Sequence, residues 1–262
     1  MSTDIKIDGD IAGCADLVRR GDPDRFLAIM AAPVGKRGAL FVIYAFNLEI
    51  ARAPWITKEE MIAEMRLQWW IDAIEEIYAG KVVRRHEVVT PLAALIAEKN
   101  LPRELFDDLI VARRWDIYSE PHANAFAFQD YIMHTSGNLM GLACLSVGMP
   151  KGDLGAAQEY GYADGVARLF LAIPELENAQ RKPLVDGRSD AVGKLAENAL
   201  MRMSEATFEG NTANAALRTA WMAKPMLKSA LRAPASVGDG QLGITDFRKK
   251  LRLIIKSFLN KY

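Results

Sequence analysis

The 262-residue chain has little of several features that define large protein classes. Its two cysteines, Cys14 and Cys144, lie far apart and form no CxxC pair, which excludes a disulfide framework and a cysteine-rich zinc site. Its 33 basic and 33 acidic residues cancel, so it lacks the basic excess of a general nucleic-acid binder. No run approaches the roughly 18 apolar residues of a membrane span.

Signatures of common catalytic chemistry are also missing. His86, His122 and His134 show no zinc-ligand spacing, and we expect them to be surface or incidental polar residues. The sequence contains neither a GxGxxG nor a GxxxxGK[ST] phosphate loop, and no GxSxG nucleophile elbow. Nucleotide binding, zinc chemistry and serine hydrolysis therefore have no support.

The two ends of the sequence bear on where the protein acts. The first ten residues, MSTDIKIDGD, resemble neither a secretory signal nor an arginine-rich transit peptide. We expect a cytoplasmic protein whose contact with a membrane is at most peripheral. The basic segment 244–260 either lies on an anionic membrane or, as we favour, packs its apolar residues onto the core.

Helical periodicity is present throughout and is punctuated by proline and glycine, whereas strand and hairpin signals are nearly absent. Half of the residues are hydrophobic, enough for a large core. We therefore predict a single all-α domain over residues 1–262, with Thr57 and Glu60 forming a capping box at one helix start. The predicted helices cover approximately residues 23–32, 36–53, 58–80, 90–99, 102–119, 127–147, 152–173, 189–209, 212–233 and 244–260.

Carboxylates are the candidate metal ligands of such a bundle, because helical bundles commonly build metal sites from acidic side chains that face a cavity. Glu104 and Asp108 share one helix face, beside Asp107. These residues form either a magnesium site or a solvated face that also carries Arg113 and Arg114. The alternating charge signs favour the solvated face.

Four stretches carry a resemblance to a known family. They are DPDRFLAIMAAPVGKRGALFVIYAFNLEIARA, EMRLQWWIDAIEEIYAG, YIMHTSGNLMGLACLSVG and YGYADGVARLFLAIPELENAQRKPL. Over nearly the whole chain, the sequence resembles the squalene/phytoene synthases, the head-to-head prenyl synthases. The resemblance implies an isoprenoid-synthase-type bundle around a central cavity. Enzymes of this family condense two prenyl diphosphates, using magnesium ions held by two aspartate-rich helices that face each other.

The first aspartate motif of the family is degenerate here. The family reads approximately Tyr-Ala-x-Cys-Arg-x-x-Asp-Asp-x-x-Asp, and Tyr44 and Ala45 match its start. The three aspartates fall on Ala51, Arg52 and Trp55. A methyl group, a cation and an indole thus stand where the resemblance implies metal ligands.

The second motif is degenerate as well. The family reads Gly-x-Ala-x(7)-Arg-Asp-x-x-x-Asp, with a further arginine downstream that Arg181 matches. Its two aspartates fall on Ala172 and Leu176. We expect Pro174, between these positions, to break the helix.

A branch of the family that lacks these aspartates resembles the chain further, and its members act as assembly factors for respiratory complex I. The resemblance implies a pseudoenzyme with no metal or resident cofactor, peripheral to the inner membrane. Its partners would be respiratory-complex subunits and a prenyl lipid or diphosphate held in the cavity. The ligand-pocket candidates are Arg37, Tyr44, Asn47, Glu49, Tyr131, Gly137, Gly141 and Asp164.

Two alternatives remain open. The chain could be an active prenyl diphosphate transferase whose magnesium ligands have moved to Glu49, Asp164 or the Asp107–Asp108 pair, with magnesium as its cofactor. It could also be a simple prenyl-lipid binding module, which needs only apolar walls and a polar mouth.

Overall fold

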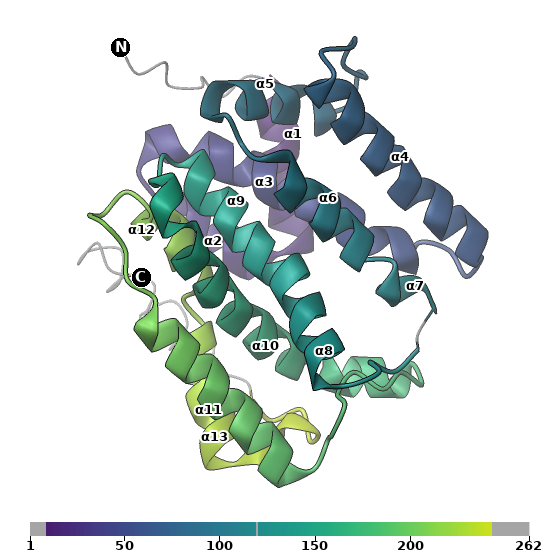
Figure 1. Cartoon of the computed structure of the whole chain (residues 1–262), viewed down its shortest axis with the longest axis vertical. Coiled ribbons are helices and arrows are strands. Elements are labelled where there is room, and N and C mark those ends of the chain that lie inside the picture. The colour runs from purple at the N-terminus through teal and green to yellow at the C-terminus, as the bar shows by residue number, and fades with distance from the viewer. Residues whose placement is uncertain (1–8, 119, 243–261) are drawn as a thin grey trace.

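The computed structural model describes residues 9–118, 120–242 and 262, and every regular element within these ranges is a helix (Figure 1). The predicted all-α class is therefore confirmed. No helix in these ranges is long and apolar enough to cross a membrane. The elements are α1 (Gly9–Gly21), α2 (Pro23–Met30), α3 (Val34–Arg52), η1 (Ala53–Trp55), α4 (Glu60–Tyr78), α5 (Val89–Lys99), α6 (Arg103–Ala112), α7 (Trp115–Tyr118), α8 (Ala125–Ile132), η2 (Met133–Gly137), α9 (Asn138–Ser146), η3 (Lys151–Asp153), α10 (Leu154–Asn178), α11 (Ser189–Glu205), α12 (Asn214–Leu217), η4 (Arg218–Ala220), α13 (Ala223–Arg232) and η5 (Pro234–Val237).

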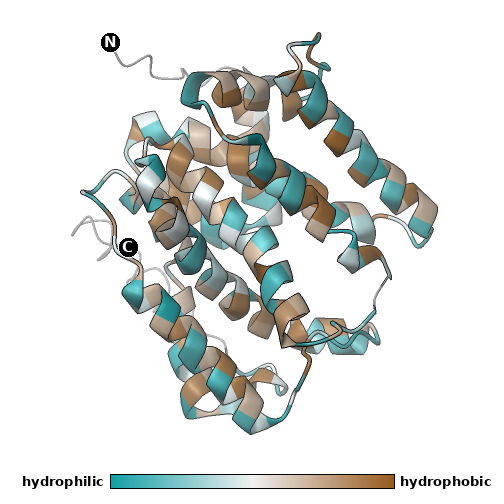
Figure 2. Cartoon of the chain, in the orientation of Figure 1, coloured by the Kyte–Doolittle hydropathy of each residue, from teal (hydrophilic) through white to brown (hydrophobic). Residues whose placement is uncertain are grey.

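Helices α3, α9 and α10 form the centre of the bundle. Every residue of α9 is buried, and α3 is buried from Gly38 to Asn47. α3 packs against α1, α2, α5 and α9, while α10 packs against η2, α9, α11 and α13. Outer helices such as α4 alternate hydrophilic and hydrophobic residues along the ribbon (Figure 2). This is the pattern expected of helices that bury one stripe and expose the other.

Short-range chemistry accounts for several helix ends. The Asp22 carboxylate caps α2 by accepting from the Arg25 backbone N–H at 3.0 Å, and Pro23 occupies the first helical position. The Asn124 side chain caps α8 by accepting from the Ala127 N–H at 2.9 Å. Asn100 ends α5 in the left-handed conformation, with φ of 48°.

Some predicted helix boundaries were wrong. The Thr57 hydroxyl accepts from the Glu59 N–H, two residues on, so a local turn replaces the predicted capping box and α4 starts at Glu60. The predicted helix 102–119 is divided into α6 and α7, and 212–233 is divided into α12, η4 and α13. The predicted helix 244–260 lies outside the described residues.

The expectation that Pro174 breaks its helix was also wrong. α10 continues through Pro174 to Asn178, a total of 25 residues. A proline removes one N–H donor and crowds the carbonyl four residues back, here that of Phe170. Phe170 and Ile173 are both buried, so side-chain packing holds the helix across this defect. The second degenerate motif therefore lies on one continuous helix.

The connection between α8 and α9 is a π-helical turn, η2. The Asn138 N–H donates to the Met133 carbonyl oxygen, five residues back. α10 approaches this turn closely, because Gly161 faces it without a side chain. A Cβ at Gly161 would lie 2.5 Å from the Ser136 carbonyl oxygen. η2 and α10 thus meet almost backbone to backbone.

Candidate functional site

The first degenerate motif lies at the carboxy-terminal end of α3 and in η1. The Arg52 guanidinium forms an ion pair with the Glu49 carboxylate at 2.8 Å, from one turn earlier on α3. Half of the Trp55 side chain is exposed, and Ala51 is partly buried. The carboxylate nearest this motif is thus already paired with a cation of its own helix.

A contact links the region of the second degenerate motif to the first. The Arg181 guanidinium, just after α10, lies over the Trp55 indole at 4.1 Å from the ring centroid. Such a cation–π contact contributes about 0.5–1 kcal/mol at an exposed position. Ala172 and Leu176 lie one turn apart on α10 and are partly buried. The contact that joins the two regions is therefore that of a guanidinium on an indole.

Asp164 lies in a ring of four alternating charges. Its carboxylate accepts from Arg25 at 3.0 Å and from Arg168 at 2.9 Å. Both arginines also pair with Asp22, at 3.3 Å and 3.1 Å. Only 3% of the Asp164 side chain is exposed. The ring is neutral overall and ties the α1–α2 turn to the middle of α10.

Burial and neighbouring charges shift the pKa values of Asp22 and Arg168 in opposite directions. Burial alone would raise the pKa of Asp22, but the Arg168 and Arg25 guanidiniums outweigh it and lower that pKa. Burial alone would lower the pKa of Arg168, but Asp164 and Asp22 outweigh it and raise that pKa. Asp22 and Arg168 are thus stabilised as ions in the folded protein.

Tyr44 belongs to the same buried region. The Arg25 guanidinium lies 4.7 Å from the centroid of the Tyr44 ring. The Tyr44 hydroxyl donates to the Thr219 hydroxyl, since Thr219 gives its own proton to the Ala216 carbonyl. Burial raises the pKa of Tyr44 to about 12. Tyr44 is therefore neutral and is held in place by its hydroxyl.

A second buried cluster contains Tyr131 and Asn47. The Tyr131 hydroxyl donates to Asp116 at 2.8 Å and accepts from Arg113 at 3.3 Å. Arg113 also pairs with Asp116 at 3.3 Å and reaches the Asn47 side-chain oxygen at 3.5 Å. The sequence interpretation placed Arg113 on a solvated face, which was wrong because only 16% of its side chain is exposed.

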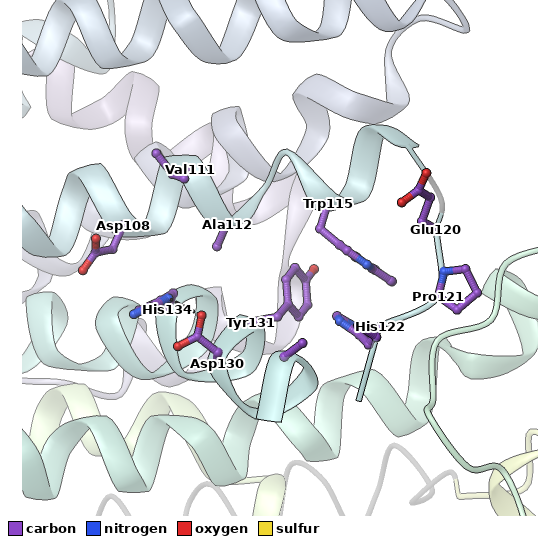
Figure 3. Close-up of a pocket in the computed structure, with 12 residues that line it drawn as sticks. Asp108, Val111, Ala112, Trp115, Glu120, Pro121, His122, Asp130, Tyr131 and His134 are labelled. Atoms are coloured by element: carbon purple, nitrogen blue, oxygen red, sulfur yellow. Dashed lines mark ion pairs between the residues drawn. The ribbon is translucent and has the colours of Figure 1, made fainter. Parts of the chain in front are cut away.

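Between α6–α7 and α8 lies a cavity of about 540 Å³, shown in Figure 3. We call it the α6–α8 pocket. His122 lies in its wall, stacked on Trp115 at 4.0 Å between ring centroids, and is 8% exposed, so of the two expected states it is a buried polar residue and not a surface one. Burial lowers the pKa of His122 to about 4. The lining residues are Asp108, Val111, Ala112, Trp115, Glu120, Pro121, His122, Ala123, Ala127, Asp130, Tyr131 and His134.

The other predicted site residues lie elsewhere. Arg37 donates to the Ala32 carbonyl oxygen at 2.8 Å, in the turn between α2 and α3. Gly137 and Gly141 face α10, where added Cβ atoms would approach Gln158 and Leu154, respectively. Asp107 pairs with Arg103 on its own helix at 2.8 Å. Across the described residues, no three histidine, cysteine, aspartate or glutamate side chains are grouped as a metal site would require.

The sequence reasoning missed the four-charge ring, although signals for it exist. Asp164 and Arg168 are spaced i, i+4, the separation at which helical ion pairs form. Asp22, Pro23 and Arg25 show the pattern of a capped helix start. What the sequence does not show is that Asp164 pairs with Arg25, which lies 139 positions earlier in the chain.

The fold is that of the isoprenoid synthases. A dehydrosqualene synthase crystal structure superposes with a TM-score of 0.79, at 17% identity and with 97% of each chain covered. Squalene synthase from Alicyclobacillus acidocaldarius superposes with a TM-score of 0.62, at 16% identity, covering 96% of this chain and 94% of that one. At these identities the superpositions show the fold alone.

The family model for squalene/phytoene synthase matches residues 18–241, and the chain belongs to that family. The human protein named NADH dehydrogenase (ubiquinone) complex I, assembly factor 6, is 26% identical over 164 residues, which are 62% of this chain and 48% of that protein. Its Drosophila melanogaster homolog is 29% identical over 184 residues, 66% of this chain and 53% of that protein. The chain thus spans about half the length of the curated relatives that it matches.

Proposed function

We propose that this protein is a non-catalytic member of the squalene/phytoene synthase family that acts in the assembly of respiratory complex I. Its relatives named complex I assembly factor 6 support the assembly role. Its partners would then be subunits of the complex, and its place would be the cytoplasmic side of the inner membrane.

One observation carries the non-catalytic part of the proposal. The carboxylates best placed to replace the missing motif aspartates are already bound by arginine. Glu49 pairs with Arg52, and Asp164 pairs with both Arg25 and Arg168. Magnesium requires several oxygen ligands in near-octahedral geometry. A magnesium ion at Glu49 would have to displace Arg52, and one at Asp164 would have to displace Arg25 and Arg168. These pairings argue against the alternative in which the magnesium ligands have moved to Glu49 and Asp164.

A second candidate function is the binding of a prenyl diphosphate without magnesium. The Nη1 atom of Arg181 is buried and has no hydrogen-bond partner in the described part of the chain. This atom lies beside Trp55, between the two degenerate motifs. An unpaired guanidinium N–H at that place could donate to a phosphate oxygen.

Titration calorimetry with farnesyl and geranylgeranyl diphosphate, with and without magnesium, tests these assignments together with an assay for released pyrophosphate. We expect no release and no magnesium dependence. A matched positive control restores the motifs as Ala51→Asp, Arg52→Asp, Trp55→Asp, Ala172→Asp and Leu176→Asp, and should gain magnesium-dependent binding. Magnesium-dependent pyrophosphate release by the wild type, abolished by Glu49→Gln, would refute the non-catalytic assignment.

The assembly role is tested in the source organism. Deletion of the gene should reduce the amount of assembled complex I on native gels and the NADH:quinone oxidoreductase activity of the membranes. Wild type and Glu49→Gln should both restore them. Unchanged complex I after deletion would refute the assembly role.

A further inference from the structure

The α6–α8 pocket has the chemistry of a cation site. Three carboxylates line it, those of Asp108, Glu120 and Asp130, and among the described residues no lysine or arginine does. Asp108, Glu120 and Asp130 are all exposed, and the Asp130 carboxylate also lies 3.3 Å from the Nδ1 atom of His134, one turn further along. The nearest buried cation, Arg113, is balanced by Asp116 behind the pocket wall.

The aromatic part of the wall strengthens this chemistry. Figure 3 shows Trp115 and His122 on one side of the pocket, Asp108, Asp130 and His134 on the other, and Tyr131 between them. Trp115 and His122 stack with an interplanar angle of 7°. Aromatic rings attract lysine and arginine cations through their quadrupoles, and carboxylates fix the position of the charge.

The stacked Trp115–His122 pair provides an independent indication of a ligand. The indole N–H of Trp115 is buried and has no hydrogen-bond partner among the described residues. Buried polar groups are normally hydrogen-bonded, and an unpartnered donor is explained by an acceptor such as a peptide carbonyl oxygen. Burial lowers the pKa of His122, which is 8% exposed, to about 4, so the imidazole is neutral near pH 7 and one ring nitrogen is a hydrogen-bond acceptor.

The surroundings indicate a macromolecular ligand. Phe126, Tyr118 and Val111 belong to the elements that border the pocket, and their side chains are 76%, 49% and 48% exposed. Exposed apolar side chains beside a polar pocket are typical of protein interaction sites. A volume of about 540 Å³ also exceeds what one small inorganic cation would fill.

We propose that the α6–α8 pocket binds a basic segment of a partner protein, with an arginine or lysine side chain between the aromatic wall and the carboxylates. The inference rests on the proposed function in one respect, namely that the partner protein is a client, meaning a subunit of complex I that is being assembled. The binding chemistry itself is tested with the purified full chain alone.

The test is calorimetric titration with an acetylated, amidated pentapeptide that carries two arginines. The same peptide with citrulline is the neutral control, because citrulline keeps the shape of arginine without its charge. We expect the arginine peptide to bind with Kd below about 1 mM and the citrulline peptide to bind at least tenfold more weakly. Asp108→Asn and Asp130→Asn should each weaken binding about two- to fivefold, more at low salt than at high salt.

Glu197→Gln, an exposed carboxylate on α11 outside the pocket, is the matched control and should leave binding unchanged. His122→Phe keeps a ring against Trp115 but removes the acceptor, so it should weaken binding without loss of fold in circular dichroism. Equal binding of the citrulline peptide, or unchanged binding in both asparagine variants, would overturn the inference. Equally tight binding of spermidine, or of phosphatidylcholine vesicles, would assign the pocket to a small cation or a lipid headgroup instead.

Complementation separates this inference from the proposed function. If Asp108→Asn/Asp130→Asn abolishes peptide binding but still restores complex I, the pocket is not the client site, while the assembly role stands. If deletion of the gene leaves complex I intact, the assembly role fails, and peptide binding then supports the pocket on its own.

Discussion

Replacing Asp164 by asparagine removes one negative charge from the four-charge ring at almost constant shape. The two charge-assisted hydrogen bonds to Asp164 measure 3.0 Å and 2.9 Å, and the side chain is 3% exposed. Hydrogen bonds to charged groups contribute about 1.5–3 kcal/mol each. Removing one partner of a buried ion pair costs about 3–5 kcal/mol, because the other charge stays buried without compensation. We expect Asp164→Asn to lower the free energy of unfolding by about 3–5 kcal/mol.

Urea unfolding at pH 7.5 and low salt, followed by circular dichroism, measures this loss. The matched control is Asp16→Asn on α1, whose ion pairs with Arg19 and Arg20 are exposed, so it should leave the free energy of unfolding close to that of the wild type. Adding Arg168→Met to Asp164→Asn should recover part of the loss, since it removes one uncompensated cation.

Two results would refute this reasoning. A loss below about 1 kcal/mol at unchanged slope would mean that the ring does not hold the fold together. Stabilisation of the wild type by magnesium, absent in Asp164→Asn, would mean that Asp164 is a metal ligand, because a ligand that binds only the folded state raises its stability.

Three further predictions concern pH, packing and the contact between the motifs. Folding lowers the pKa of His122 from 6.5 to about 4, so the unfolded chain takes up a proton first as the pH falls. The free energy of unfolding should therefore drop by up to about 3 kcal/mol between pH 6.5 and 4. His122→Phe should remove this pH dependence from the melting temperature in thermal melts. Gly161→Ala places a Cβ against backbone and should cost more than about 2 kcal/mol in urea unfolding, whereas Gly155→Ala on the same helix meets nothing within 4 Å and should be neutral or stabilising. Arg181→Gln should change the fluorescence of Trp55 and cost no more than about 1 kcal/mol, and a larger loss would mean that the contact is structural.

The sequence was sufficient for the helical class and for most helix positions, because periodicity, caps and prolines act locally. It failed at Pro174, where the sequence shows the local defect but not the burial of Phe170 and Ile173 that holds α10 together. It failed at Thr57, because a capping pattern does not show which of two nearby N–H groups the hydroxyl will meet.

The candidate site was predicted only in part. The degenerate motif positions come from the family resemblance and stay a prediction, and the structure adds the contact of Arg181 with Trp55. The neutralisation of Asp164 could not be found, because its partner Arg25 comes from a distant helix and only the tertiary fold brings them together. The buried state of His122 was missed because its packing among Trp115, Phe128 and Tyr131 arises only when α8 folds against the preceding segment.

The π-helical turn between α8 and α9 fixes the rotation of one helix relative to the other about their common axis. One extra residue in a helix advances the facing direction of everything beyond it by about 100°. The turn Met133–Gly137 therefore sets the rotational phase of Tyr131 and His134 independently of α9. Deleting a single residue there would restore a continuous α-helix but would rotate one half against the other. Either the α6–α8 pocket would lose its wall, or α9 would turn its packed surface away from Gly161.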